Sequence, residues 1–241
     1  MRKIVLVTGS SRGIGLGIAR SFAEKGHMVV LNGREDQAAL DMAVGELNQA
    51  GMSAAGFLAD LSDYDAAREM FAAIKAQYGP VDVLVNNAGA AYYGLFTDMK
   101  PQDWQGVLAA NLHTVINASH LAAPDMVRAR SGCIINITSV WGITGASCEV
   151  MYSAAKAAVI GFTKALAKEL GPSCVRVNAI ACGAFDTRMN ERLSPEEKAD
   201  FMESIPLGRF GCPSEVGPLA VYLAEAGYMT GQVIPLDGGL V

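Results

Sequence analysis

Short apolar runs rich in β-branched residues alternate along the chain with longer segments in which apolar residues recur at helical spacing. The first unit sets the pattern: residues 3–7 predict a strand, a glycine-rich turn follows, and residues 14–26 predict a helix. The same alternation predicts strands at residues 28–32, 53–59, 81–86, 134–138, 175–180 and 232–236. Helices are predicted at residues 36–50, 63–78, 101 to about 129, 151–170 and 214–226.

Two places interrupt this regular alternation. Pro124 lies inside the long segment that begins at residue 101, and we expect it to bend or interrupt that helix. The stretch 182–213 is irregular, but Ser194, Pro195 and Glu197 form a capping box with proline at the first helical position. This motif predicts a short helix that ends near residue 204.

The alternation of strands and helices predicts an α/β fold, a Rossmann-type doubly wound parallel sheet of about seven strands with helices on both faces. No linker or repeat divides the chain, so we expect a single dinucleotide-binding domain over residues 1–241, with a substrate lid region at about 183–212. In such sheets ligands bind outside the carboxyl ends of the strands. The motifs described below all fall at such ends.

Composition narrows the possible partners. The chain is 51% hydrophobic with 26 glycines, which suits a buried parallel sheet with many tight turns. Its net charge of −5 and the lack of a Lys/Arg run argue against nucleic acid or an anionic membrane as partner. No segment approaches a membrane span, and five cysteines without a CxxC pair indicate a reduced, cytoplasmic protein. The three histidines have no metal-ligand spacing, so no metal is expected.

Tyr152 and Lys156 are the first chemical candidates. Both lie on the predicted helix 151–170 at positions i and i+4, which share one helix face. A neighbouring ammonium favours the phenolate, so we expect Lys156 to lower the pKa of Tyr152 toward a range useful for proton transfer. The alternative is a surface helix with an exposed tyrosine.

A second candidate is the turn between the first strand and the first helix, where backbone N–H groups and the helix dipole favour a pyrophosphate. Its cofactor-binding residues are Gly9, Ser11, Arg12, Gly13, Ile14 and Gly15. After the second strand, Gly33 stands where a ribose-binding carboxylate is expected, and Arg34 follows it. Because Arg12 and Arg34 suit a 2′-phosphate, NADP (NADPH rather than NADH) is the expected cofactor. The acids Glu35 and Asp36 are interpreted as first-turn helix acids.

Two further strand ends carry cofactor candidates. Asp60, followed by Leu61, either accepts a hydrogen bond from an adenine amino group or caps the next helix. Asn87, Ala88 and Gly89 end the fourth strand with small residues that permit close approach of a cofactor, although turn chemistry alone also explains them.

Together these motifs resemble the short-chain dehydrogenase/reductase family. The stretch 8–15 is similar to its TGxxxGxG turn, the stretch 86–89 to its NNAG motif, and Tyr152 with Lys156 to its YxxxK motif preceded by Ser139. The resemblance runs from residue 2 to residue 241, and within the family it is greatest to bacterial 3-oxoacyl-acyl carrier protein reductases.

The resemblance implies catalytic roles that spacing alone does not. Tyr152 is the expected general acid toward a carbonyl oxygen, Ser139 polarises that carbonyl, Lys156 holds the nicotinamide ribose, and Asn111 supports a water relay. It also implies cofactor contacts from Gly183, Phe185 and Thr187. One departure is Cys182, which stands where the family usually has proline; we expect altered loop mobility rather than lost activity.

The leading functional hypothesis is an NADPH-dependent ketoreductase acting on a 3-oxoacyl thioester carried by an acyl carrier protein. Its predicted substrate pocket comprises Tyr93, Trp141, Cys148, Glu149, Phe185 and Met189. Loop aromatics also commonly cover a core, and Arg128 and Arg130 are the only candidates for docking an acidic carrier.

Alternative hypotheses stay open from sequence. The stretch 145–150 resembles reductases of the 5-aminopentanone modification on elongation factor P. On this hypothesis Glu149 lies near the pocket mouth and attracts a cationic amino ketone, although a solvent-facing carboxylate before the helix explains it as well. A third hypothesis is a non-catalytic NADP-binding regulator. A homotetramer is expected by resemblance, and small residues such as Ala154, Ala155 and Gly161 suit either helix–helix contact or packing on the sheet.

Overall fold

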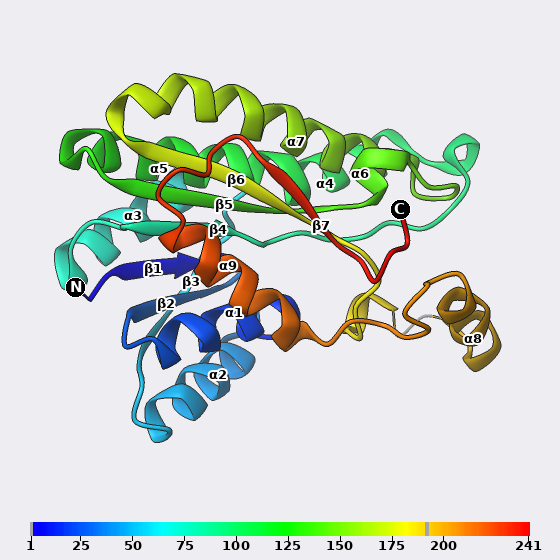
Figure 1. Ribbon diagram of the computed structural model, residues 1–241, viewed down its shortest axis with the longest axis horizontal. Helices are drawn as coiled ribbons and strands as arrows, with labels where there is room; N and C mark the ends of the chain where they lie inside the picture. Colours follow the sequence, from blue (N-terminus) through cyan, green and yellow to red (C-terminus); the bar gives the residue numbers. More distant parts are fainter. Residues whose placement is uncertain (1, 191–192) are drawn as a thin grey trace.

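The computed structural model describes residues 2–190 and 193–241. Seven strands form one parallel sheet in the order β3-β2-β1-β4-β5-β6-β7 (Figure 1). The strands are β1 Ile4–Val7, β2 Met28–Gly33, β3 Ser53–Leu58, β4 Val83–Asn86, β5 Gly132–Ser139, β6 Val175–Cys182 and β7 Val233–Leu236. The strand order reverses between β1 and β4, which confirms the predicted doubly wound fold and defines its topological switch point.

Helices cover both faces of this sheet (Figure 1). The helices are α1 Gly13–Glu24, α2 Gln37–Gln49, α3 Tyr64–Tyr78, α4 Pro101–Leu108, α5 Thr114–Ala129, α6 Trp141–Thr144, α7 Val150–Leu170, α8 Pro195–Glu203 and α9 Val216–Glu225. One core cluster joins the sheet to α1, α2 and α9, and a second joins the opposite face to α3, α5 and α7. Two separate cores therefore hold the strands between two helical layers.

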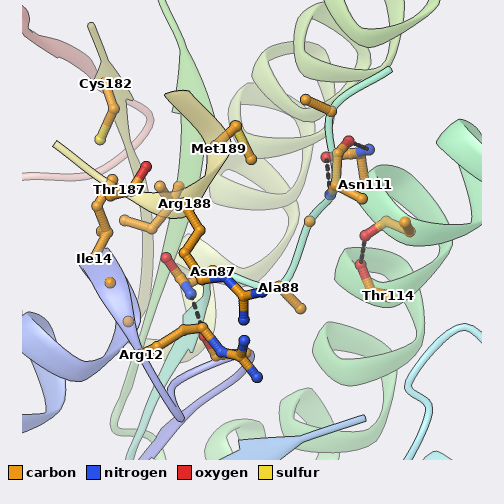
Figure 2. A pocket seen from close by; sticks show the side chains of 18 of the residues that line it. Arg12, Ile14, Asn87, Ala88, Asn111, Thr114, Cys182, Thr187, Arg188 and Met189 are labelled. Atoms are coloured by element: carbon orange, nitrogen blue, oxygen red, sulfur yellow. Dashed lines mark hydrogen bonds between the residues drawn. The ribbon is translucent and has the colours of Figure 1, made fainter. Parts of the chain in front are cut away.

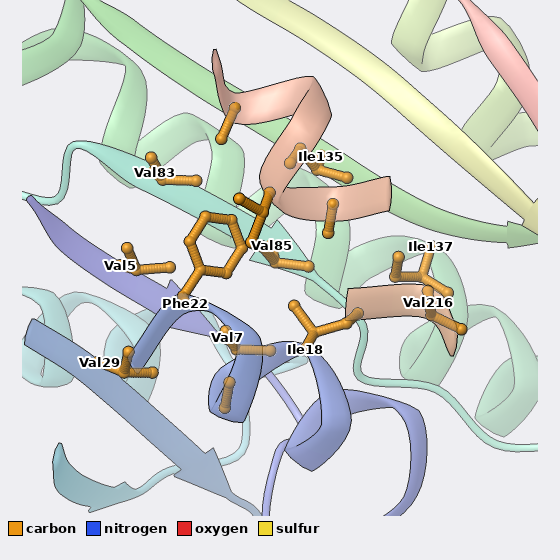
Figure 3. Close-up of a cluster of buried hydrophobic side chains, with 14 of the residues drawn as sticks. Val5, Val7, Ile18, Phe22, Val29, Val83, Val85, Ile135, Ile137 and Val216 are labelled. Atoms are coloured by element: carbon orange, nitrogen blue, oxygen red, sulfur yellow. The ribbon is translucent and has the colours of Figure 1, made fainter. Parts of the chain in front are cut away.

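The first core shows why α1 packs where it does. Phe22 and Ile18 project from one side of α1 onto valines of the central strands, and Val216 of α9 closes the cluster (Figure 3). Both α1 side chains are at most 1% exposed. Burying each contributes about 1.5–3 kcal/mol, so this face of α1 holds the glycine-rich turn in front of it against β1.

The long helical region behaves differently from the prediction. Pro124 lies inside α5, which continues through it, so the expected interruption at this proline is wrong. Its ring is exposed while Ala118, Ala122 and Met126 on the inner face are buried, and this packing keeps the helix intact. The irregularity lies instead in a π-helical turn, Ala109–His113, between α4 and α5. Such turns are rare and are frequent at functional sites.

The segment 183–212 leaves the sheet after β6 and returns close to its starting point. The backbone of Gly211 pairs with Phe185, accepts a hydrogen bond from Asp186 N and donates one to Ala184 O, both at 2.9 Å. The segment carries α8, which lies at the periphery in Figure 1. Within the expected lid region, residues 191 and 192 lie outside the described residues.

The predicted capping box is present at the start of α8. Ser194 Oγ accepts from Glu197 N at 3.2 Å, and Glu197 Oε2 accepts from Ser194 N at 2.8 Å. The short helix α6 was not predicted. Its Trp141 stacks on Phe201 of α8, with ring centroids 6.3 Å apart, and this contact joins α8 to α6.

Among the described residues, no helix is both long enough and apolar enough to cross a membrane.

Candidate active site

A cleft of about 1200 Å³ opens at the carboxyl ends of the strands. This volume exceeds the 300–1,000 Å³ usual for small-ligand pockets and suits an extended ligand. The segments after β1, β2, β3, β4 and β6 and the end of β5 contribute to its walls, and Figure 2 shows some of their side chains. All the predicted cofactor-binding residues line it: Gly9, Ser11, Arg12, Gly13, Ile14, Gly15, Gly33, Arg34, Asp60, Leu61, Asn87, Ala88, Gly89, Tyr152, Lys156, Gly183, Phe185 and Thr187.

The glycine-rich turn and the loop after β4 form one hydrogen-bonded unit. Thr8 Oγ1 accepts from the backbone N–H groups of Asn87 and Ala88, each at 2.9 Å, and Asn87 Nδ2 donates to the carbonyls of Thr8 and Gly9 at 2.9 Å. Gly9 has φ +60°, and a Cβ there would lie 2.8 Å from Ala88 Cα; a Cβ on Gly15 would lie 2.5 Å from Asn87 Nδ2. Larger side chains would therefore push the two loops apart.

The arginines at the β2 end of the cleft have acidic partners. Arg12 Nη2 lies 2.6 Å from Asp36 Oδ2, and Arg34 Nε lies 2.7 Å from Glu35 Oε1. Asp36 is the N-cap of α2 and accepts from Ala39 N at 3.0 Å. Glu35 and Asp36 therefore both precede the first turn of α2, in which they were expected. The hydrogen bond from Ala39, followed by that from Arg12, lowers the pKa of Asp36.

Asp60 does not cap the next helix, so that alternative is wrong. The N-cap of α3 is Asp63, which accepts from Ala66 N at 2.9 Å. Asp60 Oδ1 accepts instead from the backbone and the hydroxyl of Ser62, at 2.9 and 2.7 Å. Asp60 thus shapes the turn after β3 while lining the cleft.

The four predicted catalytic residues line the same cleft. Ser139 is the last residue of β5, while Tyr152 and Lys156 lie on the first turns of α7, where the sheet and α6 cover them. Tyr152 is 8% exposed and Lys156 is 4% exposed, so the alternative of an exposed surface tyrosine is wrong. Lys156 Nζ lies 5.6 Å from the Tyr152 ring centroid and donates to Ile137 O at 3.1 Å.

The electrostatics of this pair differ from the expectation. Burial raises the pKa of Tyr152, the nearby Glu149 carboxylate raises it further, and a hydrogen bond with Ser139 only partly opposes these effects. Burial also lowers the pKa of Lys156 to about 8. The expected lowering of the Tyr152 pKa is therefore wrong, because desolvation by burial is the largest effect on this phenol and raises its pKa.

Asn111 lies in the π-helical turn and is fully buried. Its Nδ2 donates to Ala90 O at 2.7 Å and to Val107 O at 2.9 Å, and its Oδ1 accepts from Ala90 N at 3.3 Å. Asn111 thus ties the loop after β4 to the helix that faces it (Figure 2).

Cys182 ends β6 directly opposite Ser139 in the parallel register. Burial raises the pKa of its thiol to about 12, so the group is a neutral thiol at physiological pH. The residues that follow it, Gly183, Phe185 and Thr187, line the cleft.

The predicted substrate pocket is only partly assembled. Tyr93, Phe185 and Met189 line the cleft, whereas Trp141, Cys148 and Glu149 are not part of its lining. The indole of Trp141 packs on the cluster around Tyr152 and stacks on α8 instead.

Several lining residues escaped the sequence analysis, among them Arg188 and Asn32. Arg188 projects into the cleft from the short 3-10 turn Arg188–Asn190 (Figure 2). Asn32 accepts from Gly9 N at 3.3 Å and so supports the glycine-rich turn from β2. A basic residue just beyond the carboxyl end of a strand was the available signal for Arg188.

No group of three or more His, Cys, Asp or Glu residues suited to a metal ion occurs in the described part of the chain.

Residues 3–198 match the family described as short chain dehydrogenase. The 3-oxoacyl-[acyl-carrier-protein] reductase FabG of Chlamydia muridarum is 40% identical over 242 residues, covering 100% of this chain and 98% of its own length. The FabG of Thermotoga maritima is 40% identical over 241 residues, covering 99% and 98%.

Solved structures agree with this match. The 3-oxoacyl-[acyl-carrier protein] reductase from Brucella melitensis superposes with a TM-score of 0.93 at 38% identity, covering 99% of this chain and 91% of its own. A proposed gluconate dehydrogenase from Agrobacterium tumefaciens gives 0.95 at 33% identity, covering 99% and 95%. The chain belongs to the short-chain dehydrogenase/reductase family, and it is an oxidoreductase that acts on a CH–OH or C=O group with a nicotinamide cofactor.

Proposed function

We propose that the protein is an NADPH-dependent 3-oxoacyl thioester reductase that accepts substrates carried by an acyl carrier protein. The observation that carries this proposal is the meeting of Ser139, Tyr152 and Lys156 in one dinucleotide-sized cleft. The full-length similarity to reductases named for 3-oxoacyl-acyl carrier protein supports the substrate class.

The residues present fit a dinucleotide. Glycines at positions 9, 13 and 15 leave room beside the amino terminus of α1, where uncapped backbone N–H groups suit a pyrophosphate. The side chain of Arg12, the N-cap residue of α1, makes no capping hydrogen bond to these groups. When bound, the nicotinamide supplies the hydride that reduces the carbonyl carbon.

Side chains of the protein would polarise and protonate the carbonyl oxygen of the substrate. The raised pKa of Tyr152 keeps the phenol protonated at neutral pH, which suits a proton donor to a developing alkoxide. The Ser139 hydroxyl, linked to Tyr152 by a hydrogen bond, is placed to polarise the same oxygen. Lys156 lines the cleft and would hold the cofactor's ribose, while Asn111 would support the relay that restores the proton on Tyr152.

The preference for NADPH rests on the β2 end of the cleft. Gly33 offers no carboxylate to a ribose 2′-hydroxyl, and Arg12 and Arg34 line the wall beside it. Both arginines have carboxylate partners, and a doubly charged 2′-phosphate would compete with those partners for the guanidinium groups.

A second substrate class has one supporting observation. Glu149 lies three residues before Tyr152, outside the cleft lining, and its charge raises the pKa of Tyr152. This charge favours a cationic amino ketone, as in the 5-aminopentanone modification of elongation factor P. Such a protein-borne ketone would need to enter at the same end of the cleft as an acyl thioester.

The test compares initial rates of NADPH oxidation with an acetoacetyl thioester and with a cationic amino ketone, each repeated with NADH. We expect the thioester and NADPH to give the highest kcat/KM. A preference for the amino ketone would overturn the thioester assignment, and equal rates with NADH would overturn the cofactor preference.

Tyr152→Phe separates catalysis from a purely regulatory role. Loss of the phenolic proton should lower kcat by about 10²–10⁴-fold while NADPH binding persists. Unchanged ketone reduction by this variant would remove Tyr152 from its proposed role as the acid.

We also propose a homotetramer. Ala154, Ala157, Ala158 and Gly161 form an exposed small-residue face on α7, whereas Ala155 packs inward. Small residues let helices of two subunits approach closely. Light scattering of the purified protein measures the mass that checks this assembly.

A further inference from the structure

Arg188 lies on the wall of the cleft opposite the glycine-rich turn. Thr187, the residue before it, faces that turn: a Cβ on Gly13 would lie 3.7 Å from Thr187 Cγ2. The 3-10 turn that carries Arg188 is held at its base, because Asn190 N donates to Thr187 O at 2.9 Å and Asn190 Nδ2 to Phe185 O at 2.8 Å. The backbone of Arg188 is therefore fixed at the rim of the cleft.

The Arg188 side chain extends from this rim into the cleft, toward the region of Arg12 and Asn87 (Figure 2). Arg12 and Arg188 both act electrostatically on the carboxylate of Asp36 and stabilise its charged form. Two guanidinium groups from different walls thus create positive potential over the same part of the cleft. One of them comes from the loop after β1, and the other comes from the segment 183–212.

We propose that Arg188 binds a phosphate group of the dinucleotide from the wall opposite the glycine-rich turn. The inference rests on the proposed function, because it takes a phosphorylated dinucleotide as the ligand of this cleft. Backbone N–H groups at the start of α1 approach the anion from one side, and the Arg188 guanidinium supplies charge-assisted hydrogen bonds from the other. The contact ties the segment 183–212 to the occupied cofactor site.

The test is Arg188→Gln, with Lys198→Gln as matched control. Lys198 lies on α8 in the same segment and is not part of the cleft lining. Its replacement by glutamine removes the same charge. Dissociation constants are measured by calorimetry for NADPH, NADH, ADP and 2′-AMP. We expect Arg188→Gln to weaken NADPH binding about 10- to 100-fold, as for the loss of a charge-assisted hydrogen bond, and Lys198→Gln to leave it unchanged.

The smaller probes identify which phosphate is bound. Weaker binding of ADP and NADH assigns Arg188 to the pyrophosphate, whereas weaker binding of 2′-AMP and NADPH alone assigns it to the 2′-phosphate; either result supports the inference. Arg188→Lys should recover part of the affinity, because it restores the charge without the planar fork.

Unchanged affinity of Arg188→Gln for all four probes overturns the inference, as does an equal loss in Lys198→Gln. If the unmodified protein binds neither NADPH nor NADH, the proposed function fails instead. Limited proteolysis adds a readout independent of affinity: saturating NADPH should protect the segment 183–212 in the unmodified protein and protect it less in Arg188→Gln.

Discussion

Lys156 is a cation in a buried position with little access to solvent. It is 4% exposed, and Ile137 O is the hydrogen-bond acceptor that holds its ammonium, at 3.1 Å. Burial lowers its pKa to about 8 from 10.5. A shift of this size corresponds to about 3 kcal/mol of destabilisation at neutral pH, so the residue is retained at a cost to the fold. That cost is expected where a charge serves chemistry rather than packing.

Lys156→Met should therefore separate stability from activity. We expect reduction to be lost and the unfolding midpoint at pH 7 to rise, because a buried charge is replaced by an apolar chain of similar length. The folded pKa lies below the unfolded one, so the folded protein binds fewer protons between about pH 8 and 10.5, and Lys156 makes the free energy of unfolding rise with pH there.

The rise of the free energy of unfolding with pH should disappear in Lys156→Met. Denaturant titrations at pH 7 and pH 10 measure it, with the exposed Lys164→Met on the same helix as control. This account would be contradicted if the stability of Lys156→Met depended on pH as strongly as that of the unmodified protein. It would also be contradicted if the variant unfolded at a lower denaturant concentration at pH 7.

At the scale of elements, the region from α4 to α5 shows how packing outweighs local propensity. Pro124 lacks a backbone N–H, yet α5 runs through it because its inner face is buried against α3 and the sheet. The π-helical turn before α5 has no proline to cause it. It coincides with the buried side-chain bonds of Asn111, so the irregularity lies where the site requires a particular geometry.

Pro124→Ala should stabilise the protein by about 1–3 kcal/mol, since alanine restores the helical N–H at an exposed position. The thermal midpoint should rise by about 2–4 °C for each kcal/mol, measured by calorimetry. Val127→Ala, exposed on the same helix, serves as control and should change stability by about 0.5 kcal/mol or less. If Pro124→Ala instead lowers the thermal midpoint, the prediction is wrong and the proline fits α5 without strain.

At the scale of the whole molecule, two cores on opposite faces of one sheet hold the carboxyl ends of the seven parallel strands at one edge of the sheet. The cleft is built from loops that belong to different βα units, so no unit forms the site alone. A ligand that spans the cleft contacts both halves of the doubly wound sheet and should stabilise the molecule as a whole.

NADPH at about 100 times its dissociation constant should therefore contribute about 2.7 kcal/mol of stability. For a chain of this size the thermal midpoint should rise by roughly 5–10 °C. Tyr152→Phe should show the same rise, since the substitution removes an oxygen used in chemistry and leaves the glycine-rich turn intact. No shift with either NADPH or NADH would mean that the cleft does not take a dinucleotide.

The amino-acid sequence by itself determined the strands, most helices, the doubly wound fold and the cofactor-binding and catalytic candidates that line the cleft. These follow from local rules: hydrophobic period, caps such as Ser194, and glycines at strand ends each act within a few residues. Because all parallel strands end at one edge of the sheet, motifs far apart in sequence were bound to meet there.

Only the tertiary structure decided the electrostatics and the detailed lining. The pKa of Tyr152 is raised chiefly by burial, to which other elements contribute. Trp141 packs against α8 rather than lining the cleft, and Arg188 enters it from a segment without sequence periodicity. These properties arise from contacts between residues distant in the chain. No local sequence pattern encodes how far such contacts desolvate a side chain or in which direction the side chain points.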